Sequence, residues 1–155
     1  MKLKTRAALA AALPAAAVLI IPAGLAAFDP WRQPPLWPAL LLFAAGAALI
    51  TLSALELYRK GGGSLAPWVP PENLVTTGPY RWSRNPVYSG TIAALAGEAL
   101  FFTSPLILLY TAAAAAGFHL RVVRYEEPEL SRLYGGRWRL YTALVARWIS
   151  LPWFK

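Results

Sequence analysis

The sequence predicts an all-α integral membrane protein with about four transmembrane helices. Three observations point to this class. Hydrophobic residues make up 57% of the chain and charged residues only 14%, against roughly 25% charged in soluble proteins. The apolar residues gather into segments whose lengths approach that of a membrane span. All but one of the 15 lysines and arginines fall on one side of a bilayer that these segments cross in alternation.

The N-terminal third of the chain, residues 7–58, is predicted to contain two spans. Residues 7–28 carry no charge, and residues 36–58 carry only Glu56. A span needs about 20 residues, so both segments qualify. The start of the chain also resembles a secretory signal, with a basic region, an apolar region and a weak cleavage pattern ending at Ala27. Both interpretations stay open, and both give the rest of the chain the same orientation.

Residues 87–120 form one longer apolar run that is interrupted at Thr103–Pro105. The run is too long for one span and slightly short for two, which favours a tight helical hairpin. Ser104 is a good N-cap, and Pro105 suits the first position of the second helix. The hairpin therefore supplies the third and fourth spans.

The positive charges give the orientation. With the N-terminus in the cytoplasm, the exception is Arg32, which falls in a short outer loop beside Asp29. Both termini are then cytoplasmic, and we expect a multi-pass protein of the bacterial inner membrane. The net charge of +8 is explained by this topology, so we expect no nucleic-acid partner. Without cysteine and with one histidine, the chain is a poor candidate for a metal cluster.

Two cytoplasmic segments join and follow the spans. Residues 59–87 contain "GGGS" and four prolines in "APWVPPENLVTTGPY", which oppose a regular helix. After Leu120 the chain turns polar, and apolar residues recur at helical spacing on either side of Gly135 and Gly136. We expect two short amphipathic helices on the membrane surface there.

The hairpin brings polar groups together at one membrane boundary. The segment "GPYRWSRNPVYSG" enters the third span, and the fourth span returns to the same side with "HLRVVRYEE". Cationic, carboxylate and aromatic groups would converge there and could hold a charged, aromatic cofactor beside lipid. Taken singly, Arg81 and Arg84 are also typical interfacial anchors, and Glu126 and Glu127 are typical of a solvated helix start.

These motifs resemble the isoprenylcysteine carboxyl methyltransferase family and the related phospholipid methyltransferases. The family pattern is roughly L-V-x-x-G-x-Y, R-H-P-x-Y-x-G, a hairpin, E-E and F-G-x-x-Y-x-x-Y. The chain matches it at Leu74, Val75, Gly78, Tyr80, Arg84, Pro86, Tyr88, Gly90, Glu126, Glu127, Tyr134, Gly135, Trp138 and Tyr141. In this interpretation the whole chain, 1–155, is one methyltransferase domain, and residues 72–141 carry the cofactor loop, the hairpin and the C-terminal motif.

The resemblance implies S-adenosylmethionine as the methyl donor. The cofactor-binding residues that it implies are Glu72, Asn73, Leu74, Val75, Tyr80, Asn85, Pro86, Val87, Tyr88 and Glu126. Physical chemistry agrees, since a tyrosine ring can face a cation and Glu126 can accept charge-assisted hydrogen bonds. Arg84 can pair with the cofactor carboxylate or with either glutamate. The candidate catalytic residues are Arg121, Glu127 and His119, with Arg121 able to steer an anionic head group.

Two residues are unexpected in this interpretation, Asn85 and Glu98. The family histidine is Asn85 here, which can donate a hydrogen bond but cannot titrate near neutral pH; His119 could compensate if it faces the site. Glu98 lies within the hairpin, where an acid is costly unless sheltered. We expect Glu98 to face the bundle interior and to bond Thr51 or Ser53, and Gly97 to allow a close helix approach.

The predicted function is methyl transfer from S-adenosylmethionine to a membrane-embedded lipid or prenylated acceptor, a carboxylate or an amine, at the cytoplasmic face. One alternative is an NADPH-dependent oxidoreductase similar to sterol reductases, whose C-terminal region looks alike. Another is a membrane subunit that has lost activity, which Asn85 makes conceivable. The sequence leaves the oligomeric state and the identity of the acceptor open.

Overall fold

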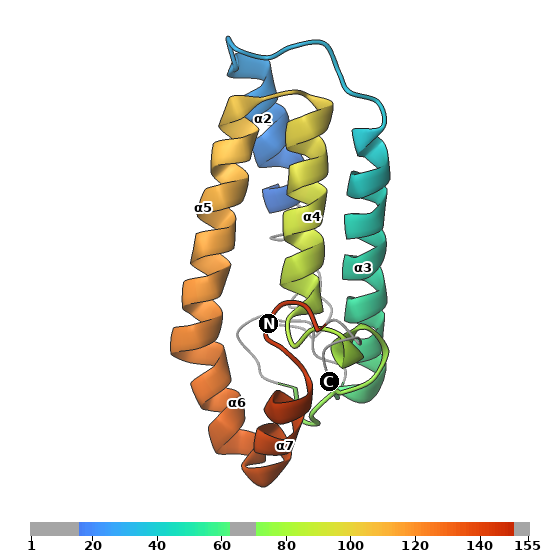
Figure 1. The fold of residues 1–155 in the computed structure, drawn as a ribbon, viewed down its shortest axis with the longest axis vertical. Helices are drawn as coiled ribbons and strands as arrows, with labels where there is room; N and C mark the ends of the chain where they lie inside the picture. Colours follow the sequence, from blue (N-terminus) through green and yellow to red (C-terminus); the bar gives the residue numbers. More distant parts are fainter. Residues whose placement is uncertain (1–15, 63–70, 151–155) are drawn as a thin grey trace, which may run out of the picture.

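The structure is a computed structural model that describes residues 16–62 and 71–150. All regular elements in these ranges are helical (Figure 1). In chain order they are η1 (Ala16–Ile20), α2 (Ile21–Phe28), α3 (Ala39–Lys60), η2 (Gly78–Arg81), α4 (Pro86–Phe101), α5 (Pro105–Arg121), η3 (Val122–Glu126), α6 (Glu127–Tyr134) and α7 (Gly136–Leu144). The all-α prediction is confirmed for the described residues.

Helices α2, α3, α4 and α5 run side by side as a bundle, with α6 and α7 at one end (Figure 1). Two of the described helices are long and apolar enough to cross a membrane, α3 with 22 residues and the continuous helix Pro105–Tyr134 with 30. At 1.5 Å per residue, α3 spans about 33 Å, close to the thickness of the hydrocarbon core. Of the first predicted span, residues 7–28, the structure describes the shorter apolar helix Ala16–Phe28. The rest of that segment lies outside the described residues, and so does the basic region on which the secretory-signal interpretation depends.

The helical hairpin is confirmed. Helix α4 ends at Phe101, the chain turns through Thr103, and α5 begins at Pro105. The side chain of Ser104 accepts a hydrogen bond from the backbone N–H of Ile107 at 3.2 Å, as an N-cap does. The turn thus has the chemistry that the sequence predicted, and it places the start of α4 and the end of α5 at the same end of the bundle (Figure 1).

Glycines bring α3 and α4 into backbone contact. A Cβ at Gly46 would lie 2.4 Å from the backbone nitrogen of Ala94, and one at Gly97 would lie 2.5 Å from that of Phe43. A Cβ at Gly90 would lie 2.9 Å from the carbonyl oxygen of Gly46. Small residues permit this approach in membrane proteins, where helices associate by packing rather than by exclusion of water. The expectation for Gly97 is confirmed, and the same contact extends to Gly46 and Gly90.

The C-terminal helices confirm the break at Gly135, whose φ of +51° interrupts the chain between α6 and α7. Helix α5 ends at Arg121, but the helical backbone does not break there. It continues through the π-helical turn η3 into α6, which makes one continuous helix from Pro105 to Tyr134. A π-turn widens the backbone just before Pro128, which lacks an N–H and would clash in a regular α-helix. Glu126 and Glu127 therefore lie where η3 passes into α6, inside the continuous helix Pro105–Tyr134, and not at a free helix N-terminus.

The prediction that Glu98 bonds Thr51 or Ser53 is wrong. The hydroxyl groups of Thr51 and Ser53 donate to carbonyl oxygens of their own helix, those of Ala47 at 2.8 Å and Leu49 at 2.6 Å. One carboxylate oxygen of Glu98 is buried without a hydrogen-bond partner among the described residues. Serine and threonine in apolar helices commonly donate their hydroxyl hydrogen to the carbonyl oxygen one turn back, so no hydroxyl hydrogen remains for a bond to a neighbouring acid.

Candidate functional site

The candidate site lies at the end of the bundle where α4 begins and α5 passes into α6 (Figure 1). Three segments that are distant in sequence meet there: the loop 71–85, the stretch 118–127 and the C-terminal segment 145–150. The convergence that the sequence predicted from the hairpin is confirmed for the start of α4 and the two glutamates. The C-terminal segment was not part of that prediction.

Tyr88, Glu126 and Arg121 form the first polar cluster. The Tyr88 hydroxyl donates to Oε1 of Glu126 at 2.5 Å, and Nε of Arg121 donates to the same oxygen at 2.7 Å. Arg121 also approaches the Tyr88 hydroxyl at 3.1 Å. The ring of Tyr88 stacks on Phe118 with centroids 4.6 Å apart. The Glu126 side chain stays 26% exposed, so a carboxylate is held in place and remains accessible.

Glu127, Arg84 and Arg147 form the second cluster. Arg147 binds Glu127 through two parallel hydrogen bonds, Nε to Oε1 at 2.9 Å and Nη2 to Oε2 at 2.8 Å. Arg84 pairs with Oε1 at 2.9 Å and stands over the ring of Trp138, 5.6 Å from its centroid. Its Nε is buried without a partner among the described residues. The cluster has two cations for one anion, so it favours a further anionic or acceptor group.

The electrostatics follow from these contacts. Burial alone would raise the pKa of Glu127, but the hydrogen bond from Arg147 and the charges of Arg84 and Arg147 outweigh burial and hold the pKa below its ordinary value of 4.5. Burial lowers the pKa of Arg84, while Glu127 opposes that shift. Glu127 is therefore a carboxylate at neutral pH, and it is engaged by cations on both sides.

The C-terminal segment 145–150 is fastened to the loop that precedes α4. The backbone N–H of Arg84 donates to the carbonyl oxygen of Ala146 at 3.1 Å, and the backbone N–H of Ser150 donates to the carbonyl oxygen of Trp82 at 2.7 Å. The side-chain amide of Asn85 donates to the carbonyl of Arg147 at 3.0 Å, and the Ser83 hydroxyl reaches the same carbonyl at 3.3 Å. Asn85 thus holds a neighbouring backbone in the place where the family pattern has histidine.

A buried cluster that is mainly aromatic packs between the loop 71–85 and α7. Trp138, Tyr141 and Val145 are buried together, with Leu74 packed against them. The Tyr141 hydroxyl donates to the carbonyl oxygen of Tyr80 at 2.7 Å. Burial raises the pKa of Tyr80 well above its ordinary range. The Tyr80 side chain is only 8% exposed, so it supports the loop instead of offering a free ring face.

The other predicted residues are placed as follows. Val75 and Pro86 are buried and Val87 is half-buried, whereas Glu72 and Asn73 are exposed in the loop. His119 is exposed, and its ring lies 6.1 Å from that of Trp148. It does not belong to the Tyr88 cluster, although its charge contributes to lowering the pKa of Glu127.

The sequence analysis missed three residues that form or support the candidate site. Arg147 was counted only as a topology marker, because no spacing rule connects it to Glu127. Phe118 had no signal apart from its place one turn before Arg121. Glu56 accepts a hydrogen bond from Thr77 at 2.5 Å and an ion pair from Lys60 at 2.8 Å, and so ties the loop to α3. Its acidic character at the end of an apolar helix was the only available clue.

The donor set suits the groups of S-adenosylmethionine. Glu126 offers an accessible carboxylate to an ammonium or a ribose hydroxyl, and the buried Nε of Arg84 has no hydrogen-bond partner within the described residues. No group of three or more potential metal ligands occurs among the described residues. The chain accordingly has the features of a helical membrane enzyme with a polar site at one end of its bundle.

A comparison with known families agrees with this class. The profile of the phospholipid methyltransferase family matches residues 35–137, which is most of the chain and includes α3, the loop, the hairpin and both glutamates. The chain belongs to the phospholipid methyltransferase family, and methyl transfer is the general activity of that family. No curated protein matches the chain in sequence.

Proposed function

We propose that the protein transfers a methyl group from S-adenosylmethionine to a membrane-embedded lipid or prenylated acceptor at the cytoplasmic face of the membrane. The observation that carries the proposal is the cluster of Tyr88, Arg121 and Glu126, which joins the start of α4 to the end of α5 in a chain of this family. S-adenosylmethionine supplies an activated methyl group, so the protein mainly has to bind and align its two substrates.

The proposal gives each group of residues at the site its own role. Glu126 binds the cofactor, and Tyr88 and Arg121 orient its carboxylate by sharing Oε1, which leaves Oε2 outside these two bonds. Arg84 offers to an anionic group its Nε, which has no partner in the described part of the chain, while Glu127 and Arg147 fix the position of its guanidinium. Residues 72–75, Pro86 and Val87 line the site in this proposal. Arg121 and His119 remain candidates for contact with the acceptor.

An apolar pocket near the site is consistent with a lipid acceptor. It has a volume of about 280 Å³ and is lined by Leu49, Pro79, Trp82, Ser83, Pro86, Ser89, Ala93, Trp148 and Ile149. It lies where α3, the start of α4 and the C-terminal segment meet. A hydrocarbon chain could occupy it while the polar end of the acceptor reaches the cytoplasmic boundary.

Cofactor binding tests the proposal directly. Purified protein in detergent should bind isotope-labelled S-adenosylmethionine, and E126Q should bind it about tenfold more weakly because a charge-assisted hydrogen bond is lost. E129Q is the matched control, since Glu129 is exposed on α6. Methyl transfer to fractionated membrane lipids then identifies the acceptor.

The same titration addresses the alternatives. Binding of NADPH without binding of S-adenosylmethionine would favour the sterol-reductase-like oxidoreductase. Equal affinity of E126Q and the wild type for S-adenosylmethionine would contradict the role of Glu126 and favour a subunit whose polar cluster is structural.

A further inference from the structure

Arg32 is a basic residue that the proposed function does not use. It lies in the loop between α2 and α3, at the end of the bundle opposite the candidate site (Figure 1). In the topology expected from the sequence, Arg32 is the exception among the lysines and arginines, because the others fall on the opposite side. A cation at this end calls for a physical explanation.

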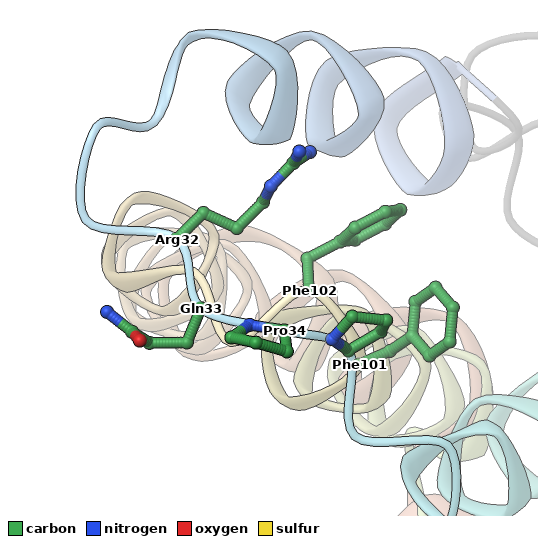
Figure 2. A pocket seen from close by; sticks show the side chains of 6 residues that line it. Arg32, Gln33, Pro34, Phe101 and Phe102 are labelled. Atoms are coloured by element: carbon green, nitrogen blue, oxygen red, sulfur yellow. The ribbon is translucent and has the colours of Figure 1, made fainter.

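Arg32 borders a pocket of about 390 Å³. The lining residues come from the outer loop and from the end of α4, and they are Arg32, Gln33, Pro34, Pro35, Phe101 and Phe102. In Figure 2 the side chains of Arg32 and Phe102 extend to the same side, toward α2, whereas Gln33 turns away. The pocket thus combines one guanidinium with two aromatic rings.

The walls of this pocket are held by hydrogen bonds. The Thr103 hydroxyl donates to the carbonyl of Gln33 at 2.7 Å and accepts from the Gln33 N–H at 3.0 Å. The N–H of Leu36 donates to the carbonyl of Phe101 at 3.0 Å. These bonds join the loop to the hairpin turn, where Thr103 has a φ of +45°. The pocket is therefore preformed, so a ligand would not have to order it.

The charge of Arg32 is not neutralised by an ion pair in the described part of the chain. Its Nη1 donates to the carbonyl of Ala26 at 3.2 Å, which fixes the side chain but supplies no full negative charge. The nearby acid, Asp29, interacts electrostatically with Arg32, but it forms no ion pair with Arg32 in the described part of the chain and caps α5. It accepts from the Ser104 hydroxyl and from the backbone N–H of Leu106 at 3.1 Å. The other N–H groups of the Arg32 guanidinium donate no hydrogen bond within the described residues, and Arg32 lines the pocket.

We propose that this pocket binds the phosphodiester headgroup of a phospholipid in the leaflet opposite the candidate active site. A guanidinium matches phosphate oxygens in charge and in donor geometry. A lipid is the source, because large apolar side chains at the same end are exposed, with Phe28 at 86%, Trp31 at 62% and Trp37 at 66%. Aromatic residues placed so are typical of the headgroup boundary. The proposal rests on membrane embedding, and not on methyl transfer.

Native mass spectrometry of the full chain released from detergent micelles tests this. The probes are phosphatidylglycerol and a diacylglycerol with the same acyl chains but no phosphate. The wild type should retain phosphatidylglycerol in preference to diacylglycerol. R32Q should bind phosphatidylglycerol about tenfold more weakly, since the charge-assisted contact is lost. R132Q is the control, because it removes the same charge from the exposed face of α6.

Thermal unfolding in detergent provides a second measurement. Phosphatidylglycerol should raise the melting temperature of the wild type and of R132Q more than that of R32Q. An equal rise in R32Q, or an equal rise with diacylglycerol, would overturn the proposal. An equal rise with inorganic phosphate at the same concentration would assign the pocket to free phosphate and overturn the lipid. If R32Q does not fold, the comparison of the probes on the wild type still decides. Binding of S-adenosylmethionine is measured separately and does not depend on these results.

Discussion

At the scale of single residues, Asn85 shows how a departure from a family pattern is accommodated. The family histidine could donate a hydrogen bond, and so can the asparagine amide. Here the amide donates to the carbonyl of Arg147, beside the Arg147 side chain that binds Glu127. Asn85 is therefore connected to the ion-pair cluster through the backbone of a third residue. A titrating group is not required for that role.

We expect N85A to lower the free energy of unfolding by about 1 kcal/mol, the net value of one partly buried hydrogen bond. N85D should be more destabilising than N85A, because its carboxylate would face the Arg147 carbonyl. Chemical denaturation in mixed micelles measures both. N73A is the control, since the Asn73 side chain is exposed. N85D as stable as the wild type would contradict the assigned contact.

Glu127 predicts a dependence of stability on pH. Its pKa is lowered in the folded protein from an ordinary value of 4.5, so its contribution is present above that value and is lost as the pH falls through the folded pKa. E127Q should be less stable than the wild type at about pH 6, and the difference should shrink by about pH 3. Melting temperatures at both pH values check this. A difference that does not change with pH would show that the charge of Glu127 is not involved.

At the scale of elements, the pairing of α3 with α4 depends on glycines. The closest backbone contacts occur at Gly46, Gly90 and Gly97. Gly90 lies one turn after Pro86 and two residues after Tyr88, so this contact sets the position of the helix that carries Tyr88. The glycine in the R-x-P-x-Y-x-G motif has a packing function in this structure.

We expect G46A to destabilise the protein by about 1–3 kcal/mol, because its Cβ would overlap the Ala94 backbone. G117A makes the same chemical change on α5, where nothing lies within 4 Å of the added carbon. It should be neutral or stabilise by up to about 1 kcal/mol through helix propensity. Thermal unfolding of both variants gives the comparison, and loss of stability in G117A alone would refute the packing assignment.

At the scale of the whole molecule, the orientation in the membrane is the principal prediction. The chain has no native cysteine, so single cysteines can report which side a residue faces. Q33C lies in the loop between α2 and α3, which we expect to face the outside, and R132C lies on α6, at the end with the candidate site (Figure 1). An impermeant maleimide should label Q33C in intact cells and R132C only after permeabilisation. Labelling of both positions in intact cells would contradict the topology.

The sequence predicted more of the fold than of the contacts at the candidate site. The hairpin followed from Ser104 and Pro105, because a cap and a helix-starting proline act locally. The meeting of Tyr88 with Glu126 followed from the hairpin and the motif spacing. The continuation of α5 into α6 was not predicted, since a π-turn before Pro128 has no clear sequence signal. The partners proposed for Glu98 were wrong, because the choice between a neighbouring helix and the local backbone depends on side-chain geometry.

The sequence by itself determined the class of protein, the helical hairpin and the family, because hydropathy, capping and motif order are properties of short stretches of chain. Only the tertiary structure decided how the polar groups pair. Arg147 reaches Glu127, Asn85 reaches the Arg147 backbone and Arg32 meets Phe102 at a pocket. Such contacts join residues far apart in the sequence. They depend on how closely the helices approach and where each side chain points, and no local pattern encodes either quantity.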